Sequence, residues 1–222
     1  MRPSLPVERR WLCAVSCVLV WLTAGAARAH DPSLDAPLPG LPEYLWLGVT
    51  HVLSGYDHLA FLLGLTLLAG SRRSLLWAVT SFTLAHSLSL GACVLDVVTP
   101  HARSVEVGIA LSIAYVAVAE RLRLPSGRGV GVALLFGFVH GFGFAGALEE
   151  IGVPSERAVP ALALFNLGVE LGQLGVLTLL LPLLARVRAR PVLWPHVLRC
   201  THAALFLLGM GLAIERSQWL WR

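Results

Sequence analysis

Six long apolar segments follow one another along the chain after a proline-rich stretch. Each is close to the roughly 20 residues that a helix needs to cross a bilayer. Short links with Gly, Pro, Ser or Arg separate them, and none shows the alternation of a membrane β-barrel strand. The pattern predicts an all-α, polytopic membrane protein with one six-helix transmembrane bundle, over residues 44–69, 74–98, 104–121, 129–148, 158–185 and 196–216.

The first 29 residues have the features of a cleavable secretory signal peptide. A basic start precedes a short apolar stretch, and the Ala-Arg-Ala run at 27–29 has the small-x-small pattern of a cleavage site. We expect residues 30–43 to form a short extracytoplasmic segment and residues 44–222 the transmembrane domain. Cleavage would make His30 the new N-terminus, whose amine and imidazole can chelate a metal. An uncleaved anchor helix is the alternative.

Composition agrees with a membrane location and excludes several other classes of protein. Charged residues make up 14% of the chain and the mean hydropathy is +0.74, whereas soluble domains carry about 25% charged residues. Such a chain cannot cover a water-facing surface, which excludes a soluble enzyme, a nucleic-acid-binding module and a disordered tail. Two of the four cysteines lie in the signal peptide, and Cys93 and Cys200 lie in apolar segments as small hydrophobic residues.

The arginines predict the orientation of the bundle. All 17 basic residues are arginines, and nine of them lie in or next to the first, third and fifth links between the apolar segments. Only four lie on the opposite side. Because basic residues remain on the cytoplasmic side, we expect both mature termini to face the extracytoplasmic side of the inner membrane.

Ionisable side chains interrupt the apolar segments, and at the helix centre each costs about 2.5–3.5 kcal/mol on insertion scales and usually marks function. Asp57, His86, His140 and Glu170 lie near the midpoints of four different segments. Ligands of one site must agree in depth, so we expect a mid-membrane site whose candidate ligands are His51, Asp57, His58, His86, His140 and Glu170. The polar residues expected to support it or to line a path are Ser54, Thr83, Glu106, Asn166 and Gln173.

Helical periodicity groups the candidates of the first segment. At about 100° per residue, His51, Ser54 and His58 share a face of one continuous helix, with Asp57 at its edge. Asp57 and His58 also have a purely structural interpretation as an internal hydrogen-bonded pair.

The fifth segment carries two stripes of opposite character. One stripe is polar, and the other consists of small residues that let a neighbouring backbone approach closely. The polar stripe contains Asn166, Glu170 and Gln173, and the small one contains Gly168, Gly172 and Gly175. We expect the glycines to face one neighbouring helix and the polar stripe to face an interior cavity.

Imidazole and carboxylate groups at one depth suit a divalent cation such as Ni, Co, Zn or Cu(II). The two methionines are too few for a Cu(I) path, and no arginine lies in the middle of a span to favour an anion. A permease site must desolvate an ion and still release it. The alternatives are an intramembrane hydrolase whose bound zinc activates water and a non-transporting scaffold for metalloenzyme assembly.

At these motifs the sequence resembles the HupE/UreJ family of membrane proteins associated with hydrogenase and urease assembly. The H-x5-D-H run is also similar to the H-x4-D-H signature of nickel/cobalt transporters. The matching stretches are residues 51–59, 82–87, 105–106, 110–113, 136–145 and 165–173.

The resemblance implies a permease with nickel as the first choice of substrate. The site positions that it implies are His51, Asp57, His58, His86, His140 and Glu170. Our hypothesis is that Asp57, His58, His86 and His140 are ligands and that Glu170 is a ligand or proton acceptor. Glu106 would be a carboxylate at the mouth of the path. The implied partners are the lipid bilayer, the metal ion and a nickel-enzyme maturation system, with no nucleic acid.

The predicted orientation can be tested with reporter fusions. A C-terminal alkaline phosphatase fusion should be active and a C-terminal green fluorescent protein fusion dark, because the C-terminus is expected to lie outside the cytoplasm. Fusions in the link at residues 70–73 should behave in the opposite way. A fluorescent C-terminal fusion together with an active phosphatase in that link would contradict the orientation.

Overall fold

The computed structural model describes residues 40–119, 128–147, 153 and 155–220, and within them every regular element is a helix. The all-α expectation is confirmed for this part of the chain. The predicted signal peptide and residues 30–39 lie outside the described residues. The helices are α2 (Leu41–Ser54), α3 (Tyr56–Leu68), α4 (Arg72–Val94), α5 (Ala102–Ala119), α6 (Arg128–Gly143), η1 (Ser155–Arg157), α8 (Ala158–Arg188), α9 (Trp194–Ser217) and η2 (Gln218–Leu220).

Among the described residues, five helices are long and apolar enough to cross a membrane. They are α4, α5, α8, α9 and the stretch Gly129–Ala147, which contains most of α6. The pair α2 and α3 passes the same test only when taken together, and its two helices are bent by 71°. The continuous helix expected over residues 44–69 is therefore wrong, although the other five segments lie where the apolar pattern placed them.

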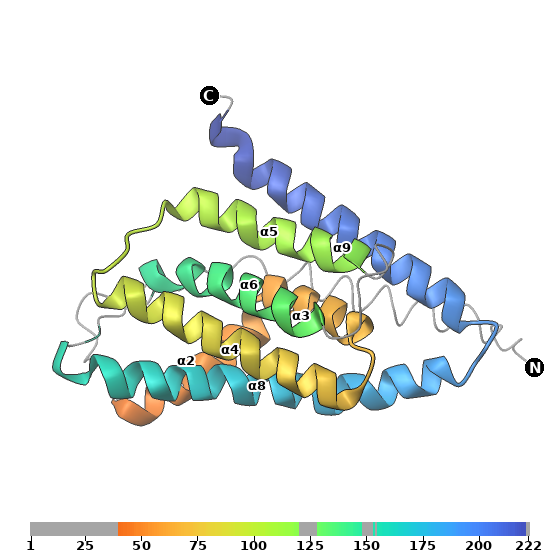
Figure 1. The fold of residues 1–222 in the computed structure, drawn as a ribbon, viewed down its shortest axis with the longest axis horizontal. Helices are drawn as coiled ribbons and strands as arrows, with labels where there is room; N and C mark the ends of the chain where they lie inside the picture. The colour runs from red at the N-terminus through yellow and green to blue at the C-terminus, as the bar shows by residue number, and fades with distance from the viewer. Residues whose placement is uncertain (1–39, 120–127, 148–152, 154, 221–222) are drawn as a thin grey trace, which may run out of the picture. The chain divides into compact units, whose positions relative to one another are not determined.

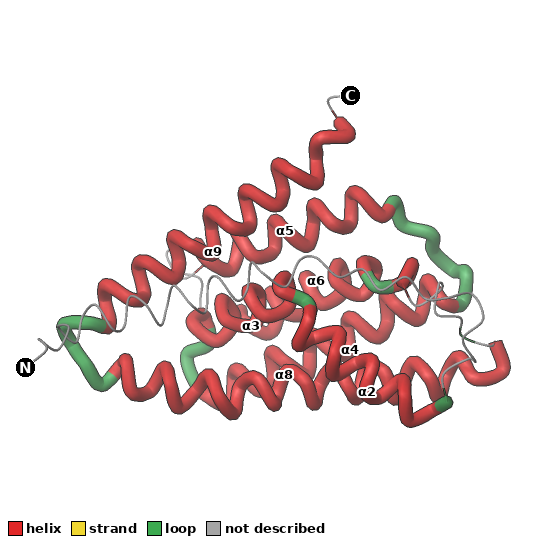
Figure 2. Tube along the Cα trace, turned by 180° about the vertical axis from the view of Figure 1, so that it is seen from behind, coloured by secondary structure: helices red, strands yellow, loops and turns green. Residues whose placement is uncertain are grey.

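Gly55 causes the break between α2 and α3 (Figure 2). Its ψ of 94° is extended, yet its N–H still donates to the carbonyl of His51 at 3.0 Å and completes the last turn of α2. A Cβ atom at this position would collide with that carbonyl and with Nδ1 of His58. Glycine therefore lets the chain bend where two histidines flank the bend.

The helices associate most closely in three pairs, α2 with α8, α4 with α6, and α5 with α9 (Figure 1). Small residues at such contacts let backbones touch, which stabilises helix packing in lipid through van der Waals contact. A Cβ atom would collide with the partner helix's backbone at Gly48 and Gly168 in the first pair, Gly137 and Gly141 in the second, and Gly209 in the third.

The predicted glycine stripe of α8 is only partly correct. Gly168 lies against the backbone of Leu45, and Gly172 lies against Val49 and Val52 of α2. A Cβ atom added at Gly175 would have no atom of α2 within 4 Å. The reason is that α2 ends at Ser54 and the chain bends away before it reaches the level of Gly175.

This difference between glycines of one helix generates a matched test. Gly168→Ala should lower the free energy of unfolding by about 1–3 kcal/mol, because the added methyl group overpacks a backbone contact. Gly175→Ala should leave it unchanged or raise it by up to about 1 kcal/mol, because alanine is the better helix former. Unfolding in detergent micelles, followed by circular dichroism, measures both. Equal effects would show that the contact with α2 does not constrain α8.

Candidate metal centre

Four histidine side chains from four helices meet inside the bundle. His51 comes from the last turn of α2, His58 from the first turn of α3, His86 from α4 and His140 from the last turn of α6. The ring centroid of His58 lies 4.5 Å from that of His51, 4.9 Å from that of His140 and 6.3 Å from that of His86. One potential ligand atom from each of His51, His58 and His86 lies within 4.8 Å of the other two. A single cation can therefore contact at least three of the rings.

Each of the four rings has one buried nitrogen without a hydrogen-bond partner. These atoms are Nε2 of His51, His58 and His86 and Nδ1 of His140. Leaving a polar atom buried and unpaired costs about 1–3 kcal/mol. A divalent cation such as Ni²⁺ or Zn²⁺ would satisfy these atoms, because neutral imidazole nitrogen is a favoured ligand for it.

The contacts of Asn166 prepare His86 as a ligand. The side-chain amide donates from Nδ2 to the carbonyl of Leu162 at 2.8 Å, which directs its Oδ1 toward Nδ1 of His86 at 3.0 Å. Since an amide oxygen can only accept, Nδ1 carries the proton and Nε2 keeps its lone pair. Metal-binding histidines usually donate their second ring N–H to a nearby acceptor in this way.

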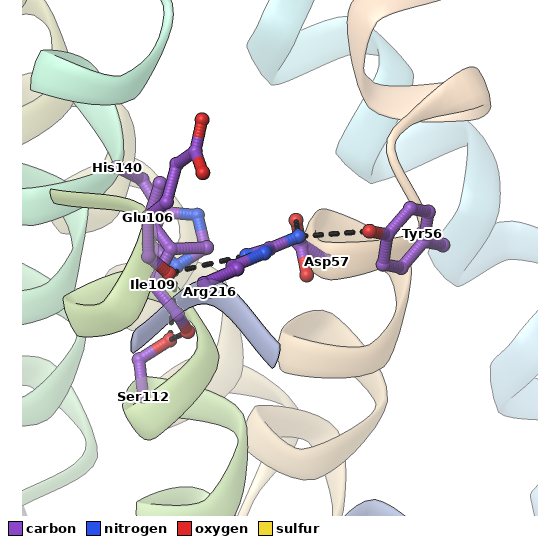
Figure 3. A network of polar contacts seen from close by, with 7 residues as sticks. All are labelled: Tyr56, Asp57, Glu106, Ile109, Ser112, His140 and Arg216. Atoms are coloured by element: carbon purple, nitrogen blue, oxygen red, sulfur yellow. Dashed lines mark hydrogen bonds and ion pairs between the residues drawn. The ribbon is translucent and has the colours of Figure 1, made fainter. Parts of the chain in front are cut away.

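Ser112 of α5 prepares His140 as a ligand in the same way, by bonding one of its ring nitrogens (Figure 3). Its hydroxyl donates to the carbonyl of Ile109 at 2.6 Å and therefore accepts from Nε2–H of His140 at 2.9 Å. The free lone pair of His140 is then on Nδ1, the atom without a partner. Sequence reasoning assigned no role to Ser112, because a lone serine in an apolar segment usually bonds to its own helix.

Phenylalanine rings enclose the histidines. The ring of His51 lies 4.1 Å from Phe144 and 5.5 Å from Phe165, and the ring of His140 lies 5.3 Å from Phe61. This shell lowers the local dielectric and limits the approach of water, which strengthens electrostatic interactions within the cluster.

The two candidate carboxylates are not part of the group of three histidines. Asp57 accepts from Arg216 at 2.9 Å, and Glu170 accepts from the hydroxyl of Thr80 at 2.6 Å. Agreement in depth does not place them in the cluster, because neighbouring positions on a helix point about 100° apart. Asp57 is next to His58 in the first turn of α3, but its Oδ2 is bonded to Arg216 of α9, whereas its Oδ1 has no partner.

The remaining predicted residues divide into two groups. Thr83 donates to Gln173 at 3.0 Å, and with His86–Asn166 and Thr80–Glu170 this pair forms a row of polar contacts between α4 and α8. Ser54 and Glu106 are exposed, and the hydroxyl of Ser54 donates to a carbonyl of its own helix. The expected continuous face is interrupted between Ser54 and His58, because the helix breaks at Gly55.

Arg216 is, after Ser112, a second functional candidate that the sequence did not indicate. The arginine pattern places it only among the four arginines on the extracytoplasmic side, yet its guanidinium extends from α9 to α3 and α5 (Figure 3). Its partner Asp57 lies 159 positions away in sequence, and no local pattern connects the two.

A cavity of about 750 Å³ lies at the end of the bundle where α4 and α6 end and α5 begins. Phe142 and Gly143, which lie in the last turn of α6 together with His140, form part of its wall. Asp96 and Glu106 also line it, and two carboxylates in a concave surface raise the local concentration of cations.

Helices of membrane-spanning length around buried histidines with free lone pairs define a polytopic membrane protein with an interior cluster of potential metal ligands. A family model described as HupE / UreJ protein matches residues 30–220, and the chain belongs to this family. The predicted resemblance is thereby confirmed. Comparison with curated proteins and with solved structures gave no match.

The hydrogen bonds around the cluster can be tested by metal binding. Ser112→Ala should weaken Ni²⁺ binding by about 10–100-fold, because His140 loses the acceptor that orients its ring. Ser87→Ala is the matched control, since the hydroxyl of Ser87 donates to a carbonyl of its own helix. Isothermal titration calorimetry on the full chain in detergent measures both affinities. Equal affinities would mean that Ser112 has no influence on a metal at His140.

Proposed function

We propose that this protein is a permease that moves a divalent transition metal, with nickel as the first choice, inward across the inner membrane. The observation that carries the proposal is that ligand atoms of His51, His58 and His86 lie within 4.8 Å of one another, and that each of these rings, like that of the neighbouring His140, has a buried nitrogen without a partner. Cobalt, zinc and copper(II) share the same preference for imidazole.

The donor set suits an ion that must both bind and leave. Uncharged imidazoles replace the water around the ion without adding negative charge to the cluster, so dissociation does not separate opposite charges within it. Selective conduction requires binding that permits release. Asp57 and Glu170 lie outside the group of three histidines and are bonded to Arg216 and Thr80.

The metal ion enters through the cavity of about 750 Å³ that Asp96 and Glu106 line. By the arginine-based orientation this end of the bundle is extracytoplasmic. The aromatic ring of Phe144 lies 4.1 Å from that of His51, and its neighbours Gly143 and Ala145 line the cavity. A movement of Phe144 would therefore connect the cavity with the cluster.

From the histidines the metal ion continues toward the cytoplasm along the row of polar contacts between α4 and α8. Beyond His86 and Asn166 this row contains the two pairs Thr83–Gln173 and Thr80–Glu170. Glu170 is half-buried and is the candidate for a second ligand on the path or for a proton acceptor. Beyond this row a buried apolar cluster that includes Leu75 and Leu177 separates the path from the link between α3 and α4. Inward release requires this layer to open.

A hydrolase remains the second candidate because three histidines and a water molecule are also the ligand set of catalytic zinc. The observation in its favour is the group of three ligand atoms from His51, His58 and His86 within 4.8 Å of one another. A metalloenzyme-assembly scaffold, working with a nickel-enzyme maturation system, would use the same site for storage.

Uptake of radiolabelled nickel into proteoliposomes tests transport directly. His58→Ala and His86→Ala should each reduce the initial rate by about tenfold or more, because each removes one donor from the cluster. His196→Ala is the control, since this histidine is exposed and bonded to the carbonyl of Val192 in its own helix region. Its uptake should equal that of the wild type.

Two results would contradict the permease. If wild-type vesicles take up no more nickel than empty ones while the purified protein retains zinc, the hydrolase interpretation is favoured. If the two histidine variants transport as fast as the wild type, an ion passes through the protein without using the cluster.

A further inference from the structure

Arg216 places a positive charge beside the proposed metal path. Its guanidinium donates to Oδ2 of Asp57 at 2.9 Å, to the hydroxyl of Tyr56 at 2.8 Å and to the backbone carbonyl of Glu106 at 3.1 Å. Figure 3 shows the side chain extending between the helix of Glu106 and that of Asp57. One residue thus connects α9 with α3 and α5.

The ion pair with Asp57 is partly withdrawn from water, since the two side chains are only 14% and 18% exposed. A charge pair in such surroundings interacts more strongly than one on the surface. The other carboxylate oxygen, Oδ1 of Asp57, is buried and has no partner. Asp57 therefore has unused capacity to interact with a second cation.

The sequence places this carboxylate directly before His58, the ring nearest to both His51 and His140 in the cluster. A divalent ion held there by neutral imidazoles lacks a counter-ion among them. The carboxylate of Asp57 would provide this counter-ion, but the guanidinium of Arg216 already neutralises the carboxylate.

We propose that Arg216 sets the metal affinity of the histidine cluster by competing with the bound cation for Asp57. The inference rests on the proposed function, because it assumes that the cluster binds a metal. In the metal-free protein the guanidinium holds the carboxylate. When the cation binds, Asp57 turns toward it and the ion pair weakens. When the cation leaves, the guanidinium takes the carboxylate back.

The surroundings of Arg216 provide a place for the guanidinium when it is released. It lines a second cavity of about 320 Å³ together with Glu106, Glu215 and Trp219. The two glutamates offer carboxylates there, and Tyr56 and the carbonyl of Glu106 already hold the guanidinium without Asp57. The exchange therefore needs a change of side-chain partner and no separation of helices.

Nickel binding to the full chain in detergent, measured by isothermal titration calorimetry, tests this competition. Arg216→Gln should tighten binding about tenfold, a typical size for coupling between two sites. Asp57→Asn should weaken binding, and the double variant should bind like Asp57→Asn alone, because Arg216 acts through Asp57. Arg103→Gln is the matched control, since Arg103 lines the same cavity but has no bond to Asp57.

Wild-type protein provides a second measurement that does not depend on the folding of a variant. Hydrogen exchange of the amides at residues 215–219 should become faster when nickel saturates the protein, because Arg216 then holds the end of α9 less firmly. Unchanged exchange would overturn the inference.

The inference also fails if Arg216→Gln binds nickel no more tightly than Arg103→Gln, or if the gain persists when Asp57 is replaced. These results leave the permease intact, since the wild type still binds metal. Absence of nickel binding by the wild type overturns the proposed function and this inference together.

Discussion

Close contact between helix backbones at glycine residues positions the other features of this bundle. Gly141 lies against the carbonyl of His86, so one contact between α4 and α6 sets the separation of His86 and His140. Gly48 and Gly168 join α2 to α8 in the same manner near His51. Lipid offers no hydrophobic force to bring helices together, so packing of small residues has to supply the attraction. The histidines come close because the backbones beneath them do.

Gly55 acts differently from the glycines at helix contacts. It interrupts a helix at a point where the packing against the neighbouring helix would otherwise continue. It puts His51 and His58 on two short helices that meet at 71°. Their rings lie 4.5 Å apart, and each keeps a nitrogen free. Asn166 bonds Nδ1 of His86, and Ser112 bonds Nε2 of His140. Together with the bend, these bonds orient the lone pairs of the unbonded ring nitrogens toward the cluster. The cluster is thus arranged for a cation by contacts that carry no charge.

Part of the fold and of the candidate site was predictable from the sequence, because these features depend on composition and on the order of residues along the chain. The apolar segments, the all-helical class, the family and the histidines are visible in the sequence, since burial in lipid leaves few places for an imidazole without a role. The continuous first helix was wrong because periodicity alone does not reveal a bend at a Ser-Gly pair. The fully packed glycine stripe was wrong because the partner helix ends before Gly175.

The sequence by itself determined which side chains are available inside the membrane-spanning segments, because hydropathy is a sum over local residues. Only the tertiary structure decided which of them meet. It separated Asp57 and Glu170 from the group of three histidines, paired them with Arg216 and Thr80, and gave His140 a partner in Ser112. These pairings join residues on different helices. Their geometry depends on helix rotation and on where each helix ends or bends, and no local pattern records either.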